Sequence, residues 1–146
     1  ADYDLSNNYD FKKVSVERDY TEGIPPIKCF GSKLQQVFLN IFINGAQAMQ
    51  ENRVKEPRML VQTFVEDDKV TVKITNWGST IPEAVQRRIF EPFFTTKPVG
   101  KGTGLGLSVS YFIVTEDHGG KIYLDSSRGD KTCFTIELPL NLDTGS

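Results

Sequence analysis

The chain has 146 residues, of which 38% are hydrophobic and 25% charged, and its formal net charge is −2. This length suits one domain with a substantial core, and the composition is that of an ordinary globular protein. A net charge so near zero creates no overall field that favours nucleic acid or anionic lipid, so we expect no nucleic-acid partner and no direct membrane contact. No apolar run approaches the roughly 20 residues of a membrane span, although a larger parent protein could be membrane-anchored elsewhere.

The boundaries of the domain follow from the polar ends of the chain. Residues 1–10 are expected to be disordered or a linker, residues 11–141 the folded domain, and residues 142–146 a loose tail. Cys29 and Cys133 stand far apart without a metal-binding pattern, and we interpret them as reduced core thiols, which fits a cytoplasmic location.

Periodicity in the first half of the chain predicts a strand, a long helix and two further strands. The helix opens with a capping pattern at Ser32, and an acidic turn joins the last two strands. Pro82 suits the first turn of a fifth element, a short helix. The expected ranges are 12–20 for the first strand, 32–51 for the long helix, 58–76 for the strand pair and 82–90 for the short helix.

The second half predicts an irregular loop over residues 91–104, a helix from about Leu105 to Asp117 ended by two glycines, and a final hairpin over residues 121–140. The order β-α-β-β-α-loop-α-β-β predicts an α+β fold. We expect a two-layer α/β sandwich, with about three helices on one face of a mixed sheet and hairpins at the sheet edges.

A polar stripe follows one face of the otherwise apolar long helix. Gln36, Asn40, Asn44 and Gln47 recur at spacings of four, four and three residues, which places them on the same side. A buried amide without a partner costs about 1–3 kcal/mol, so the stripe is expected to face a polar cavity or a ligand such as Mg²⁺. The alternative is that these amides bind neighbouring backbone groups or face solvent.

The segment GKGTGLGL has glycine at every second position from residue 100 to residue 106 and runs into a predicted helix. Glycine permits close backbone approach, and free amides at a helix start attract phosphate. Its spacing matches neither a P-loop nor a dinucleotide-binding fingerprint. With Lys97 and Lys101 on the same loop, the segment predicts a phosphate-binding lid, and a surface loop with solvated lysines is the alternative.

Two further segments precede this loop. Phe90, Phe93 and Phe94 in IFEPFF are expected to be core residues that anchor the root of the loop, ahead of any ligand role. TNWGSTIP joins a strand to a helix, with Asn76 at the strand end and Gly78 suited to a turn. By itself this second segment is expected to be an ordinary connection.

Taken together and in order, the segments resemble the catalytic, ATP-binding domain of bacterial sensor histidine kinases. QVFLNIFINGAQAM is similar to the asparagine box of that family, IFEPFFTTK to its phenylalanine box, and GKGTGLGLSVSYFIV to its second glycine box. HGGKIYLDS and FTIELPL resemble the closing strands. The resemblance covers about residues 11–140 and implies a Bergerat-type fold with a mobile, glycine-rich ATP lid.

The resemblance implies that ATP and Mg²⁺ are cofactors. Asn44 would hold Mg²⁺, Asn40 would lie beside the phosphates, and Lys97 would approach the phosphate tail, so Asn40 and Lys97 are the catalytic candidates. The nucleotide-binding candidates are Asn44, Gln47, Asn76, Gly78, Ile81, Phe93, Lys101, Gly102, Thr103, Gly104, Leu105, Gly106 and Leu107.

The resemblance also bears on the reaction. Hydrolysing relatives carry glutamate four residues before the magnesium asparagine, whereas this chain has Asn40, which cannot take up a proton near neutral pH. Phosphoryl transfer is therefore favoured over hydrolysis. The family's acceptor is a histidine on a separate dimerisation hairpin, which in turn serves a response regulator. His118 follows a helix end, and we interpret it as structural.

The chain departs from the family pattern on the base-binding side. Asn76 replaces the aspartate that accepts a hydrogen bond from the adenine amino group, Thr80 replaces a glycine, and Gly45 stands where alanine is usual. A neutral acceptor bonds about half as strongly as a charged one, so weaker base recognition is expected. The segment VTEDHGG is one residue longer than usual, which predicts a bulge or a looser turn at the helix end.

Three functions remain open at this point. The first is the ATP-binding domain of a sensor histidine kinase that phosphorylates a histidine on a partner hairpin. The second is a degenerate domain that binds nucleotide weakly or not at all and acts by binding other proteins, which the loss of the aspartate at position 76 keeps open. The third is a serine-kinase anti-sigma factor, against which Asn40 argues.

Overall fold

The computed structural model describes residues 14–20, 31–78, 81–94, 106–126 and 130–140. In chain order the elements are β1 (Ser15–Tyr20), α2 (Gly31–Glu51), β2 (Arg58–Glu66), β3 (Lys69–Trp77), α3 (Glu83–Gln86), α4 (Gly106–Phe112), the π-helical turn η2 (Ile113–Asp117), β4 (Lys121–Asp125) and β5 (Lys131–Pro139). Within these ranges no helix is long and apolar enough to cross a membrane.

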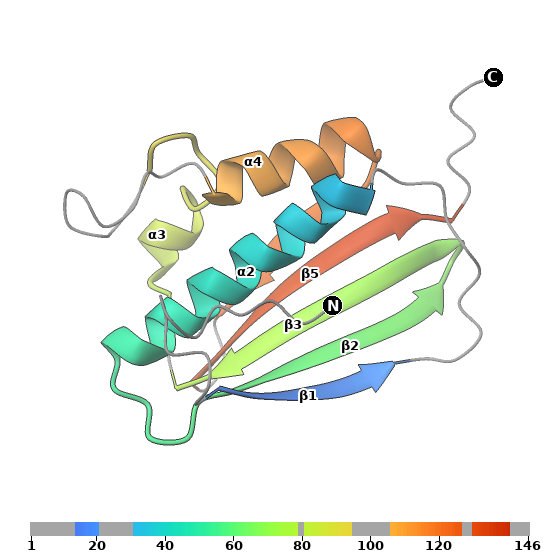
Figure 1. The fold of residues 1–146 in the computed structure, drawn as a ribbon. Helices are drawn as coiled ribbons and strands as arrows, with labels where there is room; N and C mark the ends of the chain where they lie inside the picture. Colours follow the sequence, from blue (N-terminus) through green and yellow to red (C-terminus); the bar gives the residue numbers. More distant parts are fainter. Residues whose placement is uncertain (1–13, 21–30, 79–80, 95–105, 127–129, 141–146) are drawn as a thin grey trace.

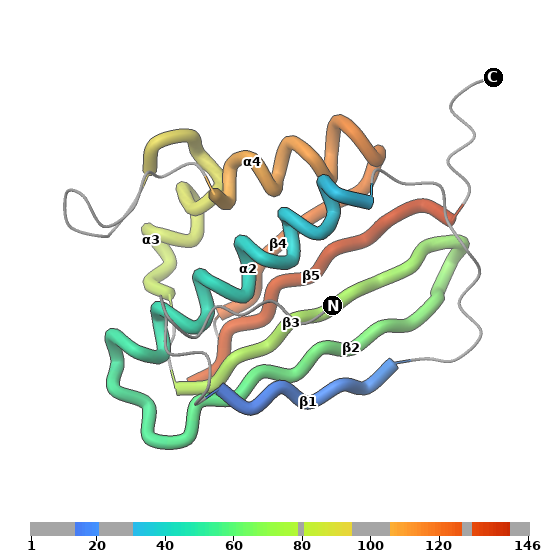
Figure 2. The backbone as a smooth tube through the Cα atoms, viewed as in Figure 1, coloured from blue at the N-terminus to red at the C-terminus, as the bar shows by residue number. Residues whose placement is uncertain are grey.

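The strands form one five-stranded sheet in the order β1-β2-β3-β5-β4, and the helices lie on one of its faces (Figure 1). β1 runs parallel to β2, and the other neighbours are antiparallel. The predicted α+β sandwich with a mixed sheet is therefore confirmed. Figure 2 shows β4 behind β5, at the sheet edge beside the helical layer.

Two predictions about the elements are wrong in detail. The β4–β5 hairpin lies at a sheet edge as expected, but the β2–β3 hairpin is interior because β1 pairs with the outer side of β2. The short helix expected over residues 82–90 is regular only over Glu83–Gln86 and continues as turns. Pro92 disfavours helical backbone at the residue before it, which discourages any extension of the helix.

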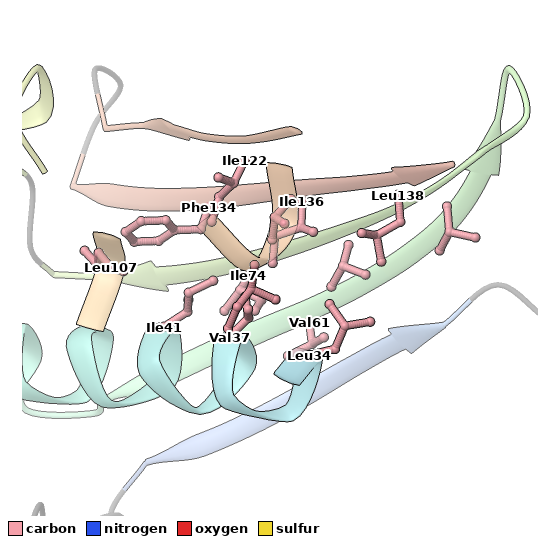
Figure 3. Close-up of a cluster of buried hydrophobic side chains, with 14 residues drawn as sticks. Leu34, Val37, Ile41, Val61, Ile74, Leu107, Ile122, Phe134, Ile136 and Leu138 are labelled. Atoms are coloured by element: carbon pink, nitrogen blue, oxygen red, sulfur yellow. The ribbon is translucent and has the colours of Figure 1, made fainter. Parts of the chain in front are cut away.

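The core lies between α2, α4 and η2 on one side and the sheet on the other (Figure 3). In β3 and β5 every second residue faces this layer, so that Ile74 is paired with Phe134 and Val72 with Ile136. α2 contributes Leu34, Val37 and Ile41 at helical spacing. Strand alternation and helix periodicity thus bury one face of each element, and this fixes α2 across the middle of the sheet.

The end of the α4 helix widens into η2, as the extra residue in VTEDHGG predicts. The π-helical turn accommodates one additional residue without unwinding the helix. His118 follows it, almost fully buried, and its Nδ1 donates to the carbonyl of Ile113 at 2.9 Å. This agrees with a structural role for His118.

The opposite face of the sheet carries polar groups and the half-buried, free Cys133, which is therefore not the core thiol expected from the sequence. There the Tyr123 hydroxyl donates to a carboxylate oxygen of Glu137 at 2.8 Å. This bond, followed by the nearby Lys69, holds the pKa of Glu137 below its usual value and raises the pKa of Tyr123.

Tyr123→Phe should raise the pKa of Glu137 toward its ordinary value. A lowered folded-state pKa contributes stability that is present above the unfolded-state pKa and is lost as pH falls through the folded-state pKa. The variant should therefore lose less stability than the wild type on acidification from about pH 5 to pH 3. Denaturant unfolding at several pH values measures this, and identical pH profiles would rule out the linkage.

Candidate functional site

One group of polar side chains joins α2 to the first turn of α4. The amide nitrogen of Asn40 donates to the carbonyl of Gly106 at 2.9 Å and to the hydroxyl of Ser110 at 3.2 Å. The Ser110 hydroxyl, fully buried, donates to the same carbonyl at 2.9 Å. An amide nitrogen carries two hydrogens, and both are engaged here, so the atom that Asn40 can offer to a ligand is its oxygen acceptor.

A second group lies where the end of β3 meets α2. Asn76 continues the alternation of Val72 and Ile74 on the helix-facing side of β3, and it is only 5% exposed. Its Oδ1 lies 3.3 Å from the position that a Cβ on Gly45 would occupy. A polar side chain is thus buried directly against the backbone of α2.

The backbone that follows Asn76 is fixed from two sides. Gly78 has a φ of +90°, and its amide donates to the carbonyl of Asp130 at 2.7 Å. A Cβ at this glycine would lie 2.5 Å from a methyl group of Val54. Glycine is therefore required here both for its backbone conformation and for the close approach.

Buried hydroxyl groups beside Asn76 were missed by the sequence reasoning. The backbone amide of Ile81 donates to the Ser126 hydroxyl at 2.8 Å, and this hydroxyl lies 2.7 Å from the hydroxyl of Thr132. Thr132 is the residue of β5 that is paired with Asn76 of β3. The signal was present, because Thr132 falls in phase with the apolar residues of β5. Only the strand register shows that it lies beside Asn76.

The two groups lie on one stretch of α2. Asn40 and Gly45 are five residues apart, which is about 7.5 Å along a helix axis. Asn44 lies between them along the helix and is half-buried, and Gln47, also half-buried, lies about one turn beyond Asn44. Gln36 is exposed, so the stripe faces solvent at its first member, whereas the other three members are half-buried.

The positions of Phe93 and Leu107 limit what each residue can contribute to a binding site. Phe93 is 74% exposed with a φ of +65°, so the expectation that it belongs to the core is wrong, whereas Phe90 packs against the core beside Phe134. The cause is geometric, because Phe93 lies in a turn that the bond from the Phe94 amide to the carbonyl of Glu91 closes, outside the regular helix and the sheet. The side chain of Leu107 is buried in the core, so only its backbone is available to a ligand.

The remaining candidates lie outside the described residues. They are Lys97, Lys101, Gly102, Thr103, Gly104 and Leu105, together with Thr80. Of the expected lid, the structure therefore describes only its C-terminal end at Gly106, which Asn40 and Ser110 hold against α2.

Comparison with known proteins agrees with this arrangement. A family model described as histidine kinase-, DNA gyrase B- and HSP90-like ATPase matches residues 31–142. The sensor kinase CckA of Brucella abortus (strain 2308) is 37% identical over 139 residues, which cover 88% of this chain and 15% of CckA. The chain thus corresponds to a small part of the length of this relative.

Solved structures show the same fold. The catalytic domain of the histidine kinase ThkA in a nucleotide-free form has a TM-score of 0.77 and 28% identity, with 93% of this chain and 86% of that chain covered. ThkA in complex with the response regulator TrrA has a TM-score of 0.74 and 25% identity, with 94% of this chain and 37% of that chain covered. The chain therefore belongs to the histidine kinase-, DNA gyrase B- and HSP90-like ATPase family, as an ATP-binding catalytic domain of the histidine kinase type.

Proposed function

We propose that this chain is the catalytic domain of a cytoplasmic two-component sensor histidine kinase, which transfers the γ-phosphoryl group of ATP to a histidine on a separate dimerisation hairpin. The observation that carries the proposal is a pair of polar contacts along α2: Asn40 with Gly106 of α4 at one position, and Asn76 of β3 beside Gly45 at the other. Their separation along the helix suits a ligand with a polar base at one end and phosphates at the other. The hairpin would pass the phosphoryl group to a response regulator, as the ThkA–TrrA complex suggests for a relative.

The residues present fit ATP and Mg²⁺. Asn44 offers a neutral oxygen ligand, which Mg²⁺ accepts together with phosphate oxygens and water. Asn76 supplies a buried hydrogen-bonding group beside a helix surface that lacks a side chain at Gly45. When bound, Mg²⁺ would neutralise charge on the phosphates.

The chain's own contribution to the reaction is positioning. Asn40 presents an oxygen acceptor and no basic group, so it can orient a hydrogen-bond donor but cannot activate a water molecule by removing its proton. Lys97 and Lys101 would approach the phosphate tail from the glycine-rich lid. Transfer to the partner histidine would then depend on alignment and charge neutralisation.

The proposal is tested with the chain and a separately produced dimerisation hairpin of its parent kinase. Incubation with Mg²⁺ and radiolabelled ATP should label the hairpin on histidine, giving an acid-labile, alkali-stable phosphate. Substitution of the acceptor histidine by alanine should abolish the label. Absence of label despite nucleotide binding would contradict the transfer reaction.

A degenerate, protein-binding domain is the second candidate, and Asn76 is the observation that favours it. Asn76→Asp separates the two. If the base lies at this residue, a charged acceptor should strengthen nucleotide binding by up to about tenfold, because a charge-assisted hydrogen bond is roughly twice as strong as a neutral one.

Calorimetric titration with ADP measures this change. Asn52→Asp, at an exposed position one turn beyond Ala48, is the matched control for the added charge. Unchanged affinity of the Asn76 variant in a domain that otherwise binds ATP well would show that the base is recognised elsewhere.

A further inference from the structure

The contact between α2 and β3 has no room for a side chain at Gly45. An added Cβ would lie 2.8 Å from the terminal methyl carbon of Met59, 3.3 Å from Oδ1 of Asn76 and 3.6 Å from Cγ of Asn76. The first distance is below any normal carbon–carbon contact, and the second is tight. Gly45 itself is buried in the middle of a 21-residue helix.

The neighbours of Gly45 are held in place. Met59 is 1% exposed and packs with Ala46 and Met49, so its methyl group has little free space to enter. The strand end at Asn76 is tethered two residues later by the bond from Gly78 to Asp130. A methyl group added to Gly45 would therefore have to displace either a packed side chain or the Asn76 amide.

Glycine in the interior of a helix is unfavourable compared with alanine, because it gives the unfolded chain more conformational freedom. The φ of Gly45 is not positive, so its backbone conformation does not require glycine. The close contact with Asn76 and Met59 supplies the reason for it.

We propose that Gly45 is a positioning residue for Asn76: by lacking a side chain, it lets the Asn76 amide lie against α2 in the orientation that the base requires. This inference rests on the proposed function, in which Asn76 contacts the base. Together with Gly78, it makes Asn76 a fixed hydrogen-bonding group at one end of the site.

The test is Gly45→Ala, with affinity measured by calorimetry for two probes: Mg²⁺ with adenosine 5′-(β,γ-imido)triphosphate, and ADP without Mg²⁺. Displacement of one hydrogen-bonding group should weaken both by about tenfold. Gly45 follows Asn44, so a disturbed magnesium ligand would instead weaken only the first probe, and that result would overturn the proposal. Gly31→Ala, where a Cβ meets nothing within 4 Å, should leave both affinities unchanged.

Met59→Leu, alone and combined with Gly45→Ala, separates the two neighbours. Leucine removes the terminal methyl carbon that lies nearest the added group. If Asn76 is the residue displaced, the double variant should remain about tenfold weaker than Met59→Leu. Recovery of the affinity of Met59→Leu would show that Gly45 serves core packing only and would overturn the proposal.

The contact is also tested without a ligand, which keeps it distinct from the proposed function. In ¹H–¹⁵N spectra the side-chain amide signals of Asn76 should shift in Gly45→Ala, while those of Asn52 should not. Unshifted Asn76 signals would overturn the positioning role even if the wild type bound no nucleotide. Failure of the wild type to bind, with shifted signals, would contradict the proposed function alone.

Discussion

Asn44→Ala should weaken the binding of nucleotide in the presence of Mg²⁺ by about 100-fold, which removes most of the gain in affinity that Mg²⁺ provides. Affinity for Mg²⁺-free ADP should stay close to that of the wild type. The side-chain oxygen of Asn44 is the proposed magnesium ligand, and alanine has none. Asn44 is half-buried on α2, and alanine is a better helix former, so the fold should persist. Titration with the imido analogue of ATP, with and without Mg²⁺, measures the difference.

Asn52→Ala is the matched control for this variant, because Asn52 lies beyond the end of α2 and bonds only to the backbone of Ala48 among the contacts described for its amide. It should keep the full magnesium dependence. The role assigned to Asn44 is wrong if Asn44→Ala and the wild type gain equally from Mg²⁺.

Gly120→Ala should destabilise the domain by about 3 kcal/mol or more. An added Cβ would lie 2.2 Å from the carbonyl oxygen of Glu137, which is backbone in β5 and cannot move as a side chain can. The amide of Gly120 also donates to the carbonyl of Val114 at 2.8 Å, so the turn after η2 is held at both ends. The β4 strand begins at the next residue and would be pushed from β5.

Gly119→Ala is the comparison for this clash. Gly119 has a φ of +63°, but a Cβ there meets nothing within 4 Å. Gly119→Ala should therefore lower the unfolding free energy only by the strain of a left-handed backbone at alanine, about 1–2 kcal/mol. Equal losses of unfolding free energy in the two variants, measured with denaturant, would show that the contact with Glu137 is relieved by a small movement.

Local sequence patterns predicted most of the fold, because each element buries one face. Alternation in β3 and β5 and the helical spacing of Leu34, Val37 and Ile41 both follow from a single hydrophobic layer. The π-helical turn η2 agrees with the bulge or looser turn that the longer VTEDHGG segment predicted by comparison with the family pattern. Strand order did not follow, because the parallel pairing of β1 with β2 depends on contacts between residues more than 40 positions apart.

The site was predicted in its parts but not in its connections. The spacing of Asn40 and Asn44 on α2 indicated a polar face, yet only tertiary structure shows that Asn40 uses both amide hydrogens on Gly106 and Ser110. Likewise, the sequence showed only that Gly45 replaces the alanine usual in the family. The short distance between Asn76 and a Cβ at this position explains why glycine stands there. Sequence spacing determines which side chains share a face, but not what another element brings against them.

The most direct test of the account is a titration of the wild-type domain with Mg²⁺ and the imido analogue of ATP, followed by NMR of the backbone amides. A nucleotide held between the two groups on α2 should shift the signals of Asn44 and Asn76 and those of Gly102, Gly104 and Gly106 at micromolar to millimolar ligand. Signals on the opposite face of the sheet, such as that of Tyr123, should stay in place. No shifts at several millimolar ligand would contradict nucleotide binding and favour a protein-binding domain.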